Sequence, residues 1–259
     1  MNAQEYSAYL KNVSVLPQVE AYKRQTYALL NIREGGTYLD MGCGTGNDAM
    51  RIAELTGTTG EVIGIDTSEE RLEEARVQAA PYYAKGLSIK FQHGDAHCLP
   101  FADNVFDGCR ADRVFQHLQD PIQAFAEMAR VAKPEGNVVI SEPDWGTLRV
   151  TEPYHPLTER VFSILPNGVR NWRMGNDLFA LFRHADFEIV NLTVWEDEIQ
   201  NFETAKEVFR FEYLATMAMD AGVVFPQQVD EWMRTLEEAE KFCISLTMFI
   251  ACGTKRRVS

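Results

Sequence analysis

Short apolar runs alternate with segments of helical periodicity through the first half of the chain. Apolar runs typical of strands occur at TYLDMG (37–42), EVIGID (61–66), LSIKFQHGD (87–95), VFDGCRAD (105–112) and GNVVISEP (136–143). Helical spacing occurs at DAMRIAELT (48–56), SEERLEEARVQAA (68–80) and DPIQAFAEMARVA (120–132). This alternation predicts an α/β fold with a parallel sheet, helices on both faces, and the carboxyl ends of the strands at one edge.

The second half departs from that rhythm. The pattern predicts a helix over 157–164, a helix over 178–186 capped by Asn176 and Asp177, a strand over 187–197, helices over 204–219 and 227–241, and a closing strand over 242–255. We interpret residues 1–259 as a single domain. Its parts are an N-terminal helical cap (1–34, with a helix over 18–30), a sheet core (35–142), two lid segments (143–175 and 200–241) and a last strand (242–253).

Composition excludes several classes of protein. The 259 residues are 46% hydrophobic and 24% charged, which is typical of a folded globular chain. The net charge of -13 repels phosphates, so we expect neither a nucleic-acid partner nor an anionic membrane surface. Five cysteines form no CxxC pair, the start of the chain lacks a secretion signal, and no apolar run approaches the roughly 20 residues that span a bilayer. We therefore expect a reduced, cytoplasmic protein.

A glycine-rich turn follows the first strand. In LDMGCGTGNDA (39–49), Asp40 ends the strand, and Gly42, Gly44 and Gly46 precede a helix. Glycines permit a close backbone approach, and a helix start favours polar or anionic groups. The same residues fit the dinucleotide pattern GxGxxA, with Asp66 about 20 residues further on as a ribose ligand. The turn alone leaves open a dinucleotide, another nucleoside, or no ligand.

A second acidic residue separates these alternatives. Asp95 follows the third strand, so Asp66 and Asp95 share one edge, as a single adenosine requires. At this point the sequence resembles the class I S-adenosylmethionine-dependent methyltransferases, in the small-molecule branch that includes the ubiquinone/menaquinone C-methyltransferases. The resemblance covers residues 35–252 and is carried by four motifs in order: LDMGCGTG (39–46), GIDTSEERLEEAR (64–76), GDAHCLPF (94–101) and FDGCRADRVFQHLQDP (106–121).

The resemblance implies a seven-stranded Rossmann-like sheet of order 3-2-1-4-5-7-6 with the last strand antiparallel, and S-adenosyl-L-methionine as cofactor. It implies that residues 35–142 bind this cofactor. Gly42 and Gly44 would lie against the methionine moiety, Asp66 would bind both ribose hydroxyls, and Thr67 would lie beside the adenine. Asp95 and the Ala96 N–H would bind adenine, and Ala111 and Asp112 would border the reactive methyl. We add Asp40 and Gly46 from the turn, and Tyr22, whose hydroxyl is placed to close over the methionine end.

The acceptor side is less defined. His117 is the first candidate for a general base because imidazole titrates near neutral pH, and Glu142 is the second. Trp145 and Arg170 are candidates for lining an acceptor cavity. No set of metal ligands is evident, so we expect no metal.

We expect methylation of a small molecule, at nitrogen or oxygen of a specialised metabolite, with C-methylation of a quinone-type ring as the alternative. Two other classes stay open at this point. One is an NAD(P)-dependent oxidoreductase, although no Tyr-x-x-x-Lys signature supports it, and the other is a non-catalytic partner-binding protein. The oligomeric state does not follow from the sequence.

Overall fold

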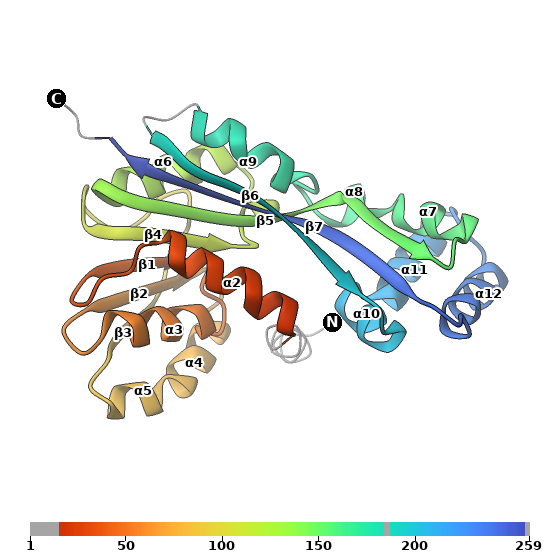
Figure 1. The fold of residues 1–259 in the computed structure, drawn as a ribbon, viewed down its shortest axis with the longest axis horizontal. Coiled ribbons are helices and arrows are strands. Elements are labelled where there is room, and N and C mark those ends of the chain that lie inside the picture. The colour runs from red at the N-terminus through yellow and green to blue at the C-terminus, as the bar shows by residue number, and fades with distance from the viewer. Residues whose placement is uncertain (1–15, 184–186, 257–259) are drawn as a thin grey trace.

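A computed structural model describes residues 16–183 and 187–256, so the first 15 residues of the expected N-terminal cap lie outside it. Within the described chain a seven-stranded sheet has the order β3-β2-β1-β4-β5-β7-β6 (Figure 1). The strands are β1 (Thr37–Met41), β2 (Glu61–Asp66), β3 (Ser88–His93), β4 (Phe106–Asp112), β5 (Ala132–Glu152), β6 (Phe187–Ile199) and β7 (Cys243–Lys255). Strands β1 to β5 pair in parallel, and β7 is antiparallel to both neighbours. The expected strand order and reversed last strand are confirmed.

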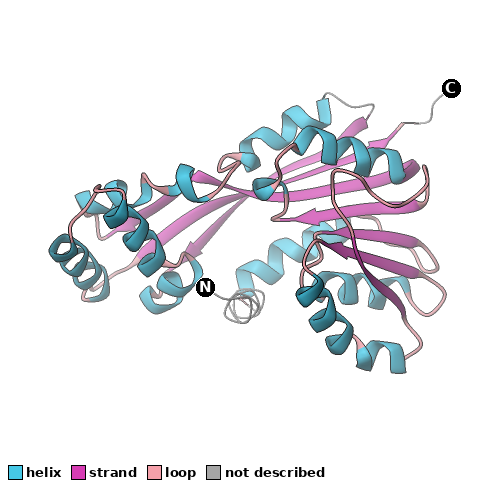
Figure 2. Ribbon diagram, turned by 180° about the vertical axis from the view of Figure 1, so that it is seen from behind, coloured by secondary structure: helices cyan, strands magenta, loops and turns pink. Residues whose placement is uncertain are grey.

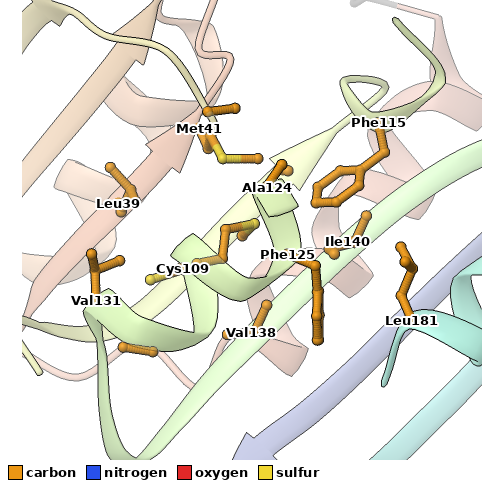
Figure 3. Close-up of a cluster of buried hydrophobic side chains, with 14 of the residues drawn as sticks. Leu39, Met41, Cys109, Phe115, Ala124, Phe125, Val131, Val138, Ile140 and Leu181 are labelled. Atoms are coloured by element: carbon orange, nitrogen blue, oxygen red, sulfur yellow. The ribbon is translucent and has the colours of Figure 1, made fainter. Parts of the chain in front are cut away.

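Helices cover both faces of the sheet. One face packs against α6 (Pro121–Val131) and α9 (Met174–Arg183), and the other packs against α2 (Pro17–Leu29), α3 (Asn47–Thr56) and α4 (Glu69–Gln78), which α5 (Ala80–Ala84) follows. Side chains alternate between the two faces: Leu39 and Met41 join the α6 side (Figure 3), whereas Tyr38 joins the α2 side. Burial on both faces explains why these strands are continuously apolar.

The helix starts follow the capping signals in the sequence. Ser68 accepts a hydrogen bond from the Arg71 backbone N–H at 3.3 Å, and Asp120 accepts one from Gln123 N–H at 2.9 Å, with Pro121 at the first helical position. These caps satisfy backbone donors that a helix end leaves without partners.

Strand β5 is longer than the sequence pattern predicts. It continues past Pro143 to Glu152 and pairs with β7, so the segment we expected to begin a lid begins as strand. The outer ends of β5, β6 and β7 project beyond the rest of the sheet and carry a separate group of helices (Figures 1 and 2). These are α7 (Pro156–Phe162), α8 (Leu165–Gly168), α10 (Phe202–Val208), α11 (Phe211–Asp220) and α12 (Pro226–Glu237), and we call this whole part the outer lobe.

The outer lobe has its own hydrophobic cluster. Trp232 is fully buried in it, packs against the Phe211 ring with centroids 5.4 Å apart, and donates an indole hydrogen bond to Thr158 at 2.9 Å. Leu148 and Val150 extend this cluster onto β5. The lobe therefore rests on a packed core of its own rather than lying over the sheet as loose loops.

Two other elements differ from the sequence expectation. The helix expected over 204–219 is divided at Arg210, whose positive φ of 53° ends α10 before α11 starts. The Arg210 guanidinium lies 4.2 Å from the Tyr213 ring centroid. Helix α9 begins at Met174, ahead of the expected cap, because Gly175 lets it approach the sheet: a Cβ there would lie 2.7 Å from Phe249.

Candidate active site

The glycine turn between β1 and α3 forms one wall of the site. Gly42, Gly44 and Gly46 have φ values of 71°, 54° and 80°, which side chains rarely adopt. A Cβ on Gly42 would lie 2.4 Å from Val114, and one on Gly46 would lie 2.6 Å from Phe91. A Cβ on Gly44 would meet no atom within 4 Å. Packing therefore accounts for Gly42 and Gly46, whereas Gly44 faces the open space that a ligand needs.

A cavity of about 330 Å³ connects this turn to the outer lobe. On the core side it is lined by Tyr22, Gly42, Gly44, Asp112 and His117. On the lobe side most of its lining is apolar and includes Trp145, Leu165, Val169, Ile199, Val208, Phe209, Leu214, Met217 and Leu246. One space thus joins the backbone of the glycine turn to an apolar chamber.

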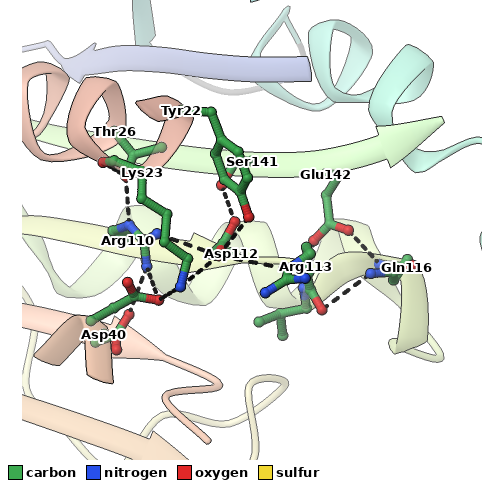
Figure 4. Close-up of polar contacts among 12 residues, drawn as sticks. Tyr22, Lys23, Thr26, Asp40, Arg110, Asp112, Arg113, Gln116, Ser141 and Glu142 are labelled. Atoms are coloured by element: carbon green, nitrogen blue, oxygen red, sulfur yellow. Dashed lines mark hydrogen bonds and ion pairs between the residues drawn. The ribbon is translucent and has the colours of Figure 1, made fainter. Parts of the chain in front are cut away.

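A buried ionic network lies beside the cavity (Figure 4). Arg110 is fully buried within 3.5 Å of three carboxylates, with contacts of 3.4 Å to Asp40, 3.2 Å to Asp48 and 3.5 Å to Asp112. The Tyr22 hydroxyl donates to Asp112 at 3.3 Å. Burial raises the pKa of Asp40 to about 7 against the opposing charge of Arg110. Asp40 does not line the cavity, and its contact in the site is the ion pair with buried Arg110.

Glu142 occupies a different position from the one expected of a base. It is fully buried and accepts hydrogen bonds from the backbone N–H groups of Val114 and Phe115, both at 2.6 Å (Figure 4). Burial raises its pKa to about 8, although these N–H groups act in the opposite direction. Glu142 does not line the cavity. Its contacts make it a positioning residue for the turn that carries His117.

His117 ends a short 3-10 helix, η1 (Phe115–His117), and lines the cavity. The surrounding protein and the positive charges of Arg71 and Arg113 lower the pKa of the imidazole. A lowered pKa keeps the ring neutral at pH 7, the form that accepts a proton. The geometry is therefore compatible with the expected role as general base, which stays a prediction.

The residues expected to bind adenosine lie outside the cavity, at the open edge of the sheet. Asp66 accepts hydrogen bonds from Gly44 N–H at 3.0 Å and Ser68 N–H at 2.9 Å. Exposed Asp95 accepts from His97 N–H at 2.9 Å, and this contact is the main reason why its pKa is lowered. Thr67, exposed, and Ala96, buried, each follow one of these acids. Because β2 and β3 are adjacent and parallel, both carboxylates end at the same edge, and their ligand roles stay predictions.

The other expected residues divide into two groups. Trp145 lines the cavity and donates its indole N–H to Gln116 at 2.7 Å. Arg170 is exposed and does not line the cavity, and Ala111 and Gly46 are buried away from it. In the described ranges no cluster of three or more His, Cys, Asp or Glu side chains is suited to a metal ion.

Sequence reasoning missed several charged groups of the site. Lys23, Asp48, Arg113, Asp197 and Arg210 all line the cavity. The sequence gave no signal for these five residues. It did give one for the neighbouring buried Arg110, because an arginine inside the apolar strand FDGCRAD requires carboxylate partners.

Together, the strand order and the reversed β7 define a Rossmann-like α/β fold, which binds ligands at the carboxyl ends of its parallel strands. A family model described as "Methyltransferase domain" matches residues 32–240, and the chain belongs to this family. It is an S-adenosylmethionine-dependent methyltransferase, which answers the cofactor question that GxGxxA left open. The residues fit that cofactor, since Gly44 faces open space and Asp66 ends β2.

Known relatives agree with this assignment. The chain is 31% identical over 245 residues to an uncharacterized 37.1 kDa protein in transposon TN4556 of Streptomyces fradiae, covering 94% of this chain and 69% of that protein. It is 35% identical over 193 residues to a demethylmenaquinone methyltransferase of Staphylococcus aureus, covering 69% and 78%. Among solved structures, the YcgJ protein of Bacillus subtilis superposes with a TM-score of 0.63 at 20% identity over 92% of this chain and all of that one, which shows a shared fold.

No helix in the part of the chain that the structure describes combines the length and apolarity needed to cross a bilayer.

Proposed function

We propose that this methyltransferase transfers a methyl group to a nitrogen or oxygen atom of a small, largely apolar molecule. The observation that supports this is the cavity of about 330 Å³ that joins the Gly44 turn to the apolar chamber of the outer lobe. Cavities at the lower end of the 300–1,000 Å³ range suit compact ligands, and an apolar wall with a few polar groups orients them.

Methyl transfer is an in-line displacement, and bound S-adenosylmethionine supplies the electrophilic methyl. The chain's own residues align the partners and exclude water. Tyr22 and Asp112 hold the wall between helix α2 and the end of β4, and Trp145 closes the lobe side through its bond to Gln116. His117 faces the same space and would take the proton from a hydroxyl or amine nucleophile.

C-methylation of a quinone-type ring is the second candidate. The 35% identity to a demethylmenaquinone methyltransferase favours it, and the apolar wall would accept such a ring. The two candidates differ in the bond formed, which is C–N or C–O in the first and C–C in the second.

An acceptor screen tests the proposal. The protein is first titrated with S-adenosylhomocysteine by calorimetry, with NADH as the negative control, and then supplied with isotope-labelled methyl donor and panels of phenols, amines and reduced quinones. The chemical shift of the labelled methyl group identifies the accepting atom. We expect O- or N-methyl products, whereas C-methyl products alone would transfer support to the quinone alternative, and no product from any panel would contradict both.

A further inference from the structure

Asp197 is the carboxylate on the lobe side of the cavity. It lies near the end of β6, paired in register with Leu246 of β7, and both residues line the cavity together with Ile199. Asp197 and Ile199 are two positions apart and therefore share one face of the strand. The carboxylate is thus set into an otherwise apolar part of the wall.

Asp197 is partly buried and lines the cavity. Its Oδ1 is closed off from solvent and has no hydrogen-bond partner in the described chain, so a donor in the cavity can reach only the other carboxylate oxygen. Burial raises the pKa of Asp197 to about 6, and a hydrogen bond from the Trp195 side chain and the charge of Arg113 act in the opposite direction. At neutral pH the group is mainly ionised. A carboxylate in an otherwise apolar cavity wall costs free energy of desolvation, so its presence there calls for a functional explanation.

Asp112, the last residue of β4, and Arg113, which follows it, line the same cavity as Asp197. Their charges also act on its pKa. Asp197 therefore shares a cavity with the end of β4, where acceptor and methyl donor would meet.

We infer that Asp197 binds the methyl acceptor by accepting a hydrogen bond from its hydroxyl or ammonium group, and so selects acceptors that carry such a donor. This inference rests on the proposed function, because it assigns the lobe half of the cavity to the acceptor. A ligand donor would add a hydrogen bond to the carboxylate, whereas a purely apolar molecule would displace water from it without replacing that bond. Discrimination by buried polar groups of this kind is stronger than discrimination by apolar fit.

Three probes of similar size test the assignment without knowledge of the natural acceptor: benzyl alcohol, benzylamine and toluene. Their affinities for the full chain saturated with S-adenosylhomocysteine are measured by ligand-observed NMR titration. We expect benzyl alcohol or benzylamine to bind the parent protein on the order of tenfold more tightly than toluene, as a satisfied hydrogen bond predicts. Equal binding of all three probes to the parent would overturn the inference, whatever the behaviour of any variant.

Two substitutions then identify the donor. Asp197→Ala should abolish the preference for either polar probe. Asp197→Asn keeps an acceptor oxygen and loses the charge, so it should retain a preference for benzyl alcohol and lose one for benzylamine. Glu196→Gln is the matched control, since Glu196 is on the same strand but half-exposed and paired with Arg149 at 2.7 Å. A preference that persists in Asp197→Ala would overturn the assignment.

The proposed function fails separately. If the acceptor screen yields no methylated product, methylation of a small molecule is contradicted, while the probe affinities still decide whether Asp197 recognises a donor. If products form but the probes show no preference, the role of Asp197 is wrong and the methylation stands.

Discussion

The sheet core and the outer lobe build their halves of the cavity in opposite ways. On the core side, much of the lining lies in the turns after β1 and β4, with Tyr22 of α2 beside them, and the geometry of these turns is fixed by positive-φ glycines and by backbone N–H groups that donate to Glu142. On the lobe side, the wall is made of side chains from long strands and helices, from Trp145 to Leu246. The core wall is therefore set mainly by backbone geometry, whereas the lobe wall is set by side chains that can be exchanged without changing the turns of the core.

The largest expected effect concerns the separate core of the lobe. Trp232→Ala should lower the free energy of unfolding by about 3–5 kcal/mol, because it leaves a cavity in the centre of the cluster. Acceptor turnover should fall with it, while affinity for S-adenosylhomocysteine changes little. Urea unfolding and calorimetry measure the two quantities. Tyr154→Ala, at an exposed aromatic of the same lobe, should change neither. A parallel loss of cofactor affinity would show that the two halves are not independent.

The next largest effect concerns His117, the candidate general base. His117→Ala should reduce turnover about 100-fold and leave S-adenosylhomocysteine affinity unchanged, because a general base acts only on the acceptor. Since the pKa of His117 is lowered, the acidic limb of kcat/KM should lie below the ordinary imidazole value of about 6.5 and vanish in the variant. Steady-state rates across pH measure both. His93→Gln, outside the cavity, is the control, and an unaltered rate in His117→Ala would leave it a structural histidine.

A substitution on the core side should instead weaken binding of the cofactor. Asp66→Ala should weaken S-adenosylhomocysteine binding roughly 10- to 100-fold, as loss of hydrogen bonds to a charged group predicts. Calorimetry measures this, with Asp103→Asn at an exposed ion pair as the control. Unchanged affinity would show that the nucleoside part of the cofactor does not bind at this edge of the sheet.

The last effect is read from the pH dependence of stability and concerns Glu142. Its pKa is raised to about 8, so the folded state binds a proton that the unfolded state releases above about 4.5. The contribution of Glu142 to stability is therefore present below pH 4.5 and declines as pH rises toward 8. Because the raised pKa values of Asp40 and Asp197 act in the same range, denaturant unfolding should show a steeper decline in the parent than in Glu142→Gln. Identical pH dependence in both proteins would contradict the raised pKa.

How far the sequence predicts the molecule follows the same division. The glycine turn and the place of Asp66 at a strand end were predictable from local sequence patterns, whereas the strand order was implied by the family resemblance. The lobe was less predictable: residues 143–175 were expected to form a lid, although Leu148 and Val150 alternate as in a strand and continue β5. Asp197 gave no signal, because its place in the cavity depends on Leu246 and Arg113, which are distant in sequence. The positive φ of Arg210, which divides the expected helix, gave no signal in the sequence either.

The long strands also determine how the molecule can bend. The β5–β7 ladder runs from Asn137 opposite Thr254 to Glu152 opposite Cys243. The same two paired strands therefore run through both the core and the outer lobe, and no linker separates the two parts along these strands. The ladder is interrupted where residues 145–148 lie opposite Leu246 alone. At this interruption β5 lacks regular pairing with β7, whereas β7 stays paired with β6, where Leu246 lies opposite Asp197. Because Trp145 and Leu246 both line the cavity there, any bending of β5 at this point would move the cavity wall, while the glycine turn lies outside this pair of strands.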